Sequence, residues 1–159
     1  MNEKWVPFHV PSIGEEEIAA VSQTLRSGWL TTGSKVKEFE AQFAERVGAK
    51  HAVATNSGTA ALHIALEALG VREGDEVIVP SFTFFATASC VWRVGAQPVF
   101  VDIDPETYNL DPKHVEAAIT RATRAIIPVH LFGQCAPMDV LGEIARRHDV
   151  HIVEDAAQS

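Results

Sequence analysis

The chain has 159 residues, of which 47% are hydrophobic and 21% are charged, a composition typical of a globular protein with its own core. Its formal net charge of −8 argues against nucleic acid as a partner, because a phosphate backbone requires clustered lysine and arginine. No apolar run approaches the roughly 18 residues typical of a membrane span, and residues 1–10 lack the apolar core of a secretory signal, so we expect a cytoplasmic protein that does not contact a membrane.

Two amphipathic helices are predicted before any strand. The first, Glu15–Arg26, follows Ser12, whose spacing to Glu15 resembles a capping box. The second, Ser34–Val47, carries an apolar stripe. The stretch Gly28–Gly33 separates them. We expect residues 1–50 to form a helical arm that packs on a neighbouring element or subunit instead of joining a sheet.

Residues 51–159 alternate short apolar, β-branched runs with helical patterns. The predicted strands are His51–Thr55, Glu76–Pro80, Pro98–Val101, Ala125–Val129 and Val150–Glu154. The predicted helices are Thr59–Leu69, Phe84–Arg93, Pro112–Thr120 and Met138–Arg147. Strands that alternate with helices predict an α/β fold, with a mostly parallel, twisted sheet and helices on both faces.

The sequence ends at Ser159, shortly after the last predicted strand. A parallel strand is buried on both faces, and no helical pattern follows to cover this one. We therefore expect the sheet to be incomplete at its C-terminal side, as in a truncated chain.

Ligands of open α/β sheets bind at the carboxyl ends of the strands. The segment Asn56–Ala60 joins a predicted strand to a predicted helix. The free N–H groups and the dipole at the start of a helix suit a phosphate. An ordinary N-cap by Ser57 or Thr59 explains the same residues equally well. Asp155 ends an apolar strand, where a buried carboxylate needs a partner such as a protonated ring nitrogen. A helix cap or a salt-bridged loop acid is the alternative for Asp155. Gln158 is placed either to bind the same ligand or to face water.

Other strand ends carry weaker candidates. Phe84 follows a predicted strand, where its ring either stacks on a flat ligand or packs in the core. His130 lies in a loop, either as an acid or base or as a structural histidine. Asp102 and Asp104 have no third ligand spaced to form a metal site, and a turn before Pro105 explains them better.

Taken together, these segments resemble a known family. The chain is similar to fold-type I pyridoxal-phosphate enzymes, and specifically to the DegT/StrS group of sugar-nucleotide aminotransferases. The resemblance covers nearly the whole chain, through the segments Pro7–Ser12, Gly28–Gly33, Asn56–His63, Gly74–Ser81, Thr83–Thr87, Pro128–Gly133 and Glu154–Gln158.

The resemblance implies that residues 51–159 are part of the large cofactor-binding domain and that a small C-terminal domain is absent. It implies pyridoxal 5'-phosphate as the cofactor, with Phe84 stacked on the pyridine ring, Asp155 paired with the ring nitrogen and Gln158 at the ring hydroxyl. The implied phosphate ligands are Ser57, Gly58, Thr59 and Ala60, with the amides of Thr59 and Ala60 in contact. The implied substrate contacts are Trp29, Leu30, Thr31 and His130.

The resemblance also implies an activity, namely transfer of an amino group from an amino acid, expected to be glutamate, to a keto-sugar nucleotide by a homodimer. In the relatives a lysine beyond the aspartate forms the Schiff base, whereas every lysine of this chain precedes Asp155. We therefore expect this chain alone to be inactive and to hold the cofactor only noncovalently. Two alternatives stay open, a dehydratase of the same group and a non-enzymatic truncated product. No GxGxxG opens the first βα turn, which argues against a dinucleotide-binding domain.

Overall fold

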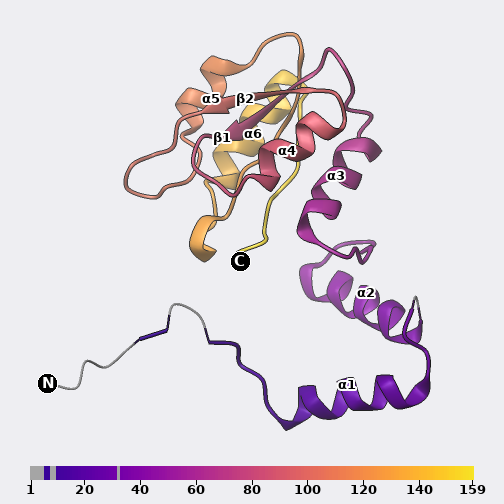
Figure 1. The fold of residues 1–159 in the computed structure, drawn as a ribbon. Coiled ribbons are helices and arrows are strands. Elements are labelled where there is room, and N and C mark those ends of the chain that lie inside the picture. The colour runs from indigo at the N-terminus through magenta and orange to yellow at the C-terminus, as the bar shows by residue number, and fades with distance from the viewer. Residues whose placement is uncertain (1–5, 8–9, 32) are drawn as a thin grey trace, which may run out of the picture. The chain divides into compact units, whose positions relative to one another are not determined.

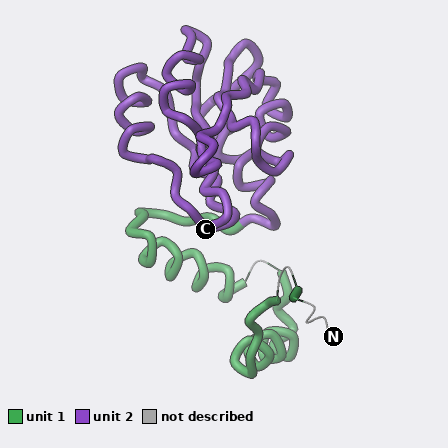
Figure 2. Tube along the Cα trace, turned by 90° about the vertical axis from the view of Figure 1, so that its left-hand side faces the viewer, with its two compact units in different colours: residues 1–54 green, residues 55–159 purple. Residues whose placement is uncertain are grey.

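The computed structural model describes residues 6–7, 10–31 and 33–159. Lys4, residues 8–9 of the Pro7–Ser12 segment and Thr32 lie outside the described residues. The chain divides into two compact units, residues 1–54 and residues 55–159 (Figure 2). Within the described ranges, no helix is both long and apolar enough to cross a membrane.

Unit 1 contains two helices, α1 (Glu15–Ser27) and α2 (Ser34–Val47). The N-cap of α1 is Gly14 and not Ser12, because the N–H of Gly14 donates to Oε2 of Glu17 at 2.6 Å. That backbone hydrogen bond lowers the pKa of the Glu17 carboxyl. The capping box predicted from Ser12 and Glu15 is therefore wrong. The box lies two residues later, with Gly14 as the N-cap and Glu17 as the residue whose carboxylate accepts from the N-cap N–H.

Neither helix of unit 1 has a buried residue. On α2, the rings of Phe39 and Phe43 lie 5.7 Å apart but remain 56% and 49% exposed. On α1, Val21 and Leu25 are each 60% exposed. The two helices are amphipathic, as predicted, and their apolar faces are open within this unit.

Unit 2 is built around a parallel sheet (Figure 1). Its elements in chain order are α3 (Gly58–Ala68), β1 (Glu76–Pro80), α4 (Ala86–Arg93), β2 (Gln97–Val101), α5 (Pro112–Ala118), β3 (Thr123–Ile126), the 3-10 helix η1 (Leu131–Gly133), α6 (Met138–His148) and β4 (His151–Ile152). The strand order is β2-β1-β3-β4, and every pairing is parallel. The predicted parallel α/β fold is confirmed.

Helices cover both faces of this sheet. Val77 and Val79 of β1 pack on one face with residues of α3 and α4, including Leu66 and Val91. Ile78 points to the other face, into a cluster with residues of α5 and α6. Because both faces are covered, the strands are apolar at consecutive positions and do not alternate with polar residues.

One predicted strand is wrong. His51–Thr55 forms no strand, and the division between the two units falls within it. Val53 is 76% exposed, and the N–H of Ala54 donates to Oε1 of Glu40 at 2.9 Å instead of to a strand. An apolar β-branched run becomes a strand only where a neighbouring strand supplies hydrogen-bond partners, and none does so here.

Three other strands have bounds that differ from the prediction, and the smallest difference is in β2, which begins at Gln97 instead of Pro98. β3 begins at Thr123 and ends at Ile126, and β4 contains only two residues. Beyond them, Val129 and Asp155 form a separate parallel bridge, in which the N–H of Asp155 donates to Pro128 O at 2.9 Å. This bridge places Asp155 at the carboxyl ends of the two strands.

Candidate ligand-binding site

A cavity of about 190 Å³ opens where the first turn of α3 meets the carboxyl ends of β1 and β3. Most of the side chains around it are small or apolar, and one is a carboxylate. It is lined by Gly58, Thr59, Leu62, Thr83, Phe84, Ala86, Val129, Asp155, Ala157 and Gln158. The structure thus brings together five residues predicted from sequence, Gly58, Thr59, Phe84, Asp155 and Gln158, although they come from three separate segments of the chain.

The first turn of α3 forms one end of the cavity. Ser57 is the N-cap, and its Oγ accepts from the N–H of Ala60 at 3.1 Å. Among the residues that the structure describes, none accepts a hydrogen bond from the N–H of Gly58 or of Thr59. These two amides, with the positive end of the helix dipole behind them, suit an anion such as a phosphate. The resemblance had implied Thr59 and Ala60, but the Ala60 amide is already engaged by Ser57.

Asp155 also lines the cavity and is only 7% exposed. Its Oδ2 accepts from the hydroxyl of Thr87 at 2.8 Å, and its Oδ1 accepts from the N–H of Ala157 at 3.3 Å. None of the ion pairs found in the described part of the chain includes Asp155. A buried carboxylate without a cation is costly, so the site favours a ligand that carries a positive N–H.

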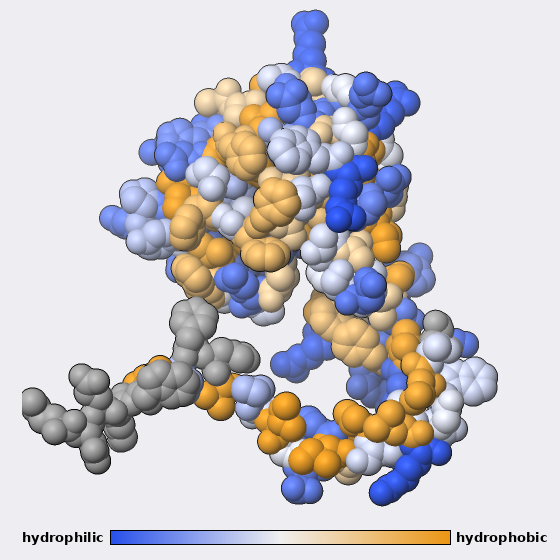
Figure 3. Space-filling view, in the orientation of Figure 1, coloured by the Kyte–Doolittle hydropathy of each residue, from blue (hydrophilic) through white to orange (hydrophobic). Residues whose placement is uncertain are grey.

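Phe84 is the aromatic residue of the cavity lining. Its ring is 73% exposed, so it belongs to the cavity wall and not to the core. The neighbouring Phe82 differs, since its ring packs against Tyr108 with centroids 5.9 Å apart. Apolar side chains gather on the face of unit 2 seen in Figure 3, and Phe85, Trp92 and Phe100 contribute to an adjoining groove with Phe84. An exposed ring beside a cavity is suited to stacking on a flat ligand.

Gln158 is held by a strained turn. Its Oε1 accepts from the backbone N–H of Phe132 at 2.7 Å, which assigns the amide so that Nε2 is the group left to donate to a ligand. Phe132 adopts φ 55° and ψ 23°, a left-handed conformation that costs a non-glycine residue about 1–2 kcal/mol. Gly133 follows with φ 85°. Such strain beside a cavity is typical of functional sites.

His130 lies close by but does not line the cavity. Its Nδ1 accepts from the N–H of Ala136 at 3.1 Å, so Nε2 carries the proton and donates to Oε2 of Glu154 at 2.9 Å. The side chain is buried, and both ring nitrogens are engaged by the protein. A substrate contact by His130 remains a prediction.

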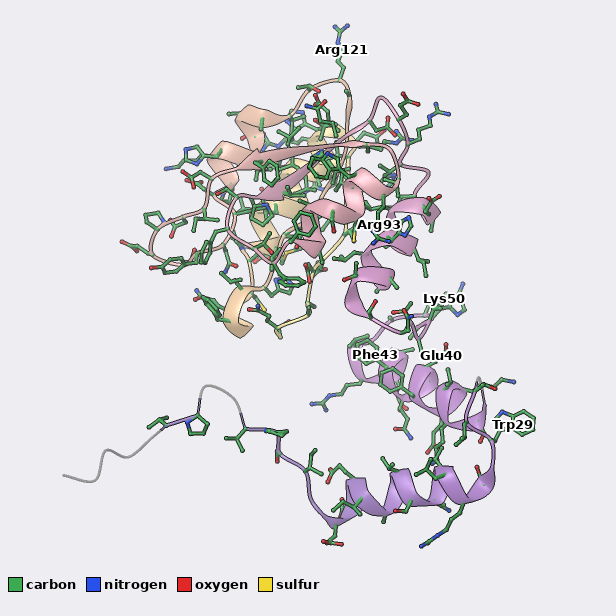
Figure 4. The ribbon with its side chains drawn as sticks, viewed as in Figure 1. Trp29, Glu40, Phe43, Lys50, Arg93 and Arg121 are labelled. Atoms are coloured by element: carbon green, nitrogen blue, oxygen red, sulfur yellow. The ribbon has the colours of Figure 1, made fainter. Side chains whose placement is uncertain are left out.

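The other predicted substrate residues lie in unit 1. Trp29, Leu30 and Thr31 border a separate hollow of about 260 Å³ that also includes Lys35. Figure 4 shows the Trp29 side chain at the turn between α1 and α2, where it is 66% exposed. Their contact with a substrate also remains a prediction.

Two residues of α4 contact this site without having been predicted from the sequence, Thr87 and Cys90. Thr87, which is fully buried, donates to Asp155, and Thr83 is paired with Thr87 at 3.0 Å. The thiol of Cys90 donates to the carbonyl of Thr59 at 3.2 Å. Burial raises the pKa of the Cys90 thiol, so it stays protonated as this donor requires. The Thr83–Thr87 segment was visible in the sequence, but nothing local indicated its partner.

Comparison with known proteins identifies relatives of the whole chain. Residues 11–159 match the profile of the DegT/DnrJ/EryC1/StrS aminotransferase family. The spore coat polysaccharide biosynthesis protein SpsC of Bacillus subtilis (strain 168) is 51% identical over 155 residues, which are 98% of this chain and 40% of SpsC.

Two solved structures are similarly close. DesV of S. venezuelae, solved in complex with a ketimine intermediate, is 50% identical with a TM-score of 0.88 over 91% of this chain and 39% of its own. Spr1654 of Streptococcus pneumoniae, solved in its PLP-form, is 41% identical with a TM-score of 0.89 over 96% of this chain and 43% of its own. The chain therefore spans less than half the length of these relatives.

Proposed function

Because the chain belongs to the DegT/DnrJ/EryC1/StrS aminotransferase family, we propose that it forms the noncovalent part of a pyridoxal 5'-phosphate site in a sugar aminotransferase. The reaction we propose transfers an amino group from an amino acid, with glutamate as the donor, to a keto-sugar nucleotide. The PLP-form of Spr1654 and the ketimine complex of DesV support the choice of cofactor. The polysaccharide role in the name of SpsC supports a sugar substrate.

The observation that carries this proposal is the buried carboxylate of Asp155, which has two neutral donors and no cation among the described residues. A protonated pyridine nitrogen supplies the missing positive charge. In the same cavity, the amides of Gly58 and Thr59 are open for a phosphate, and the exposed ring of Phe84 belongs to the lining. A phosphorylated, flat, nitrogen-containing ring matches all three requirements.

Each side chain has one task in this proposal. Asp155 holds a proton on the ring nitrogen, and with that proton in place the cofactor supplies an electron sink for the substrate carbanion. Phe84 covers one face of the ring and excludes water from it. Gln158 donates Nε2–H to the ring oxygen, with its orientation set by Phe132. Gly58 and Thr59 bind the phosphate through their amides.

Among the residues that the structure describes, no lysine lines the cavity. Lys35, Lys37, Lys50 and Lys113 all lie elsewhere within the described ranges. We therefore expect cofactor binding by this chain to be noncovalent.

Binding of the cofactor is tested by equilibrium dialysis of the chain against pyridoxamine phosphate and against pyridoxamine. The phosphorylated form should bind more tightly, because only it reaches the amides of α3. Borohydride treatment in the presence of pyridoxal phosphate, followed by mass spectrometry, should leave no single lysine modified in stoichiometric yield. Equal affinity for the two forms, or one fully labelled lysine, would contradict the proposal.

The reaction is tested on the protein as its gene encodes it, with glutamate and a panel of keto-sugar nucleotides. A product that gains nitrogen from labelled glutamate supports aminotransfer. A product that loses water without gaining nitrogen identifies a dehydratase instead.

We also propose that the site works in a homodimer, with Trp29, Leu30, Thr31 and His130 on the substrate side. The support is the open apolar face of each helix in unit 1, which none of the described residues of that unit covers. Sedimentation equilibrium should show a dimer, and a monomer at all concentrations would contradict this.

We also propose a cytoplasmic location. The free thiols of Cys90 and Cys135 favour it, because thiols stay reduced there.

A further inference from the structure

We propose that α4 is a positioning element of the cofactor cavity, through Thr87, which orients the carboxylate of Asp155, and Cys90, which holds the backbone of Thr59. The proposal rests on the function proposed above and assigns roles to two residues that do not themselves reach the ligand. Neither Thr87 nor Cys90 lines the cavity, yet each donates a hydrogen bond to a residue that does.

Thr87 orients the carboxylate of Asp155. A hydroxyl has one proton to donate, and an ionised carboxylate only accepts, so Thr87 donates to Oδ2 and the shared hydrogen bond with Thr83 runs from Thr83 to Thr87. The hydroxyls form an ordered chain from Thr83, at the cavity wall, to the carboxylate. Each carboxylate oxygen of Asp155 thus accepts one hydrogen bond, Oδ2 from Thr87 and Oδ1 from the N–H of Ala157. These two contacts fix the orientation of the carboxylate, and with it the direction of the lone pairs that are left for a ligand.

Cys90 holds the start of α3. Its thiol is fully buried and donates to the carbonyl of Thr59, the residue whose amide we assign to the phosphate. A carbonyl and an amide that flank the same Cα move together, so this contact limits the movement of the open amides. A thiol is a weak donor, and its contribution is correspondingly smaller than that of Thr87.

The two contacts are set one helical turn apart. Thr87 and Cys90 are related by i, i+3, so their side chains leave α4 on the same face. The helix is itself fixed in the core, with Ala88 and Val91 packed against α3 and β1, whereas Arg93 projects from its last turn (Figure 4). Because this turn of α4 is fixed in the core, its hydrogen bonds to Asp155 and to Thr59 limit any change in the distance between the Asp155 carboxylate and the Thr59 amide.

The Thr87 role is tested with two probes that form no Schiff base, pyridoxamine phosphate and its 1-deaza analogue, in which carbon replaces the ring nitrogen. Wild-type chain should prefer pyridoxamine phosphate, because only this probe can pair with Asp155. Thr87→Val should weaken binding of pyridoxamine phosphate about tenfold and leave binding of the deaza analogue nearly unchanged, so the preference should fall about tenfold. Thr87→Ser, which keeps the hydroxyl, should restore it.

The control for loss of a buried threonine hydroxyl is Thr123→Val, in β3 and away from the cavity. It should leave the preference intact even if stability falls. An unchanged preference in Thr87→Val, or an equal loss for both probes, would overturn the role of Thr87, because a purely structural defect weakens both probes alike.

The Cys90 role predicts the complementary pattern. Cys90→Ala should weaken pyridoxamine phosphate about threefold while leaving phosphate-free pyridoxamine unchanged, and Cys90→Ser should recover the phosphate preference. An unaltered phosphate preference in Cys90→Ala would remove Cys90 from the proposal. If wild-type chain binds none of these probes, the proposed function itself fails. If it binds them with both preferences and the variants do not change them, only the role of α4 fails.

Discussion

Replacement of Asp155 by asparagine should separate ligand affinity from stability. In the native chain, Asp155 accepts one hydrogen bond on each oxygen and lacks a cation within the described residues. An asparagine can keep both contacts. Its Oδ1 accepts from Ala157 N–H, and its Nδ2 donates to the hydroxyl of Thr87, which then donates to Thr83.

The substitution therefore removes a buried charge without leaving a polar atom unpaired. We expect the free energy of unfolding of the ligand-free chain to stay within about 1 kcal/mol of the native value, or to rise. A hydrogen bond between a charged N–H and a carboxylate contributes about 1.5–3 kcal/mol, so affinity for pyridoxamine phosphate should fall about 10- to 150-fold.

Equilibrium dialysis and urea unfolding measure the two quantities on the same protein. Asp102→Asn is a matched control, because Asp102 is an exposed carboxylate at the end of β2 that does not line the cavity. That variant should change neither quantity. If Asp155→Asn binds pyridoxamine phosphate as tightly as the native chain, or if it unfolds, the assignment of Asp155 to a ring nitrogen is refuted.

Three further predictions concern individual side chains. Phe84→Ala should lower the affinity for pyridoxamine phosphate about 2- to 12-fold by loss of stacking. It should change the free energy of unfolding by less than about 0.5 kcal/mol, because the side chain is 73% exposed. A large loss of stability in urea would instead place this ring in the core. Ser57→Ala should cost about 1 kcal/mol in urea unfolding by loss of the α3 cap, and an unchanged midpoint would show that the cap is not needed. The backbone N–H groups of Thr107 and Glu106 hold the pKa of the Asp104 carboxyl below its ordinary value. The stabilisation by this carboxylate is therefore fully present above the unfolded-state pKa and is lost as pH falls through the lower folded-state pKa. The stability difference between native chain and Asp104→Asn should therefore shrink in acid, and a difference that stays constant across the acid range would exclude this effect.

Much of the fold follows from local pattern. Consecutive apolar residues in Glu76–Pro80, flanked by helical periods, predict a strand buried on both faces, and β1 has that position in the sheet. Ligands bind at the carboxyl ends of parallel strands, which predicts the segments containing Phe84 and Asp155 as parts of a site. Thr59 follows His51–Thr55, which forms no strand, but it lies in the first turn of a helix, and the structure places all three residues around one cavity.

Features that depend on pairing between distant segments did not follow from local pattern. His51–Thr55 has the composition of a strand, but a strand exists only where another strand accepts its hydrogen bonds, and the sequence does not state which segments meet. The contact between Thr87 and Asp155 joins residues 68 positions apart. Whether their side chains meet depends on how α4 packs against the sheet, to within a few tenths of an ångström, because a hydrogen bond weakens steeply outside its narrow range of distance and angle. Local composition and periodicity thus predict which residue types lie at the strand ends, whereas tertiary packing sets which of those side chains form hydrogen bonds with one another.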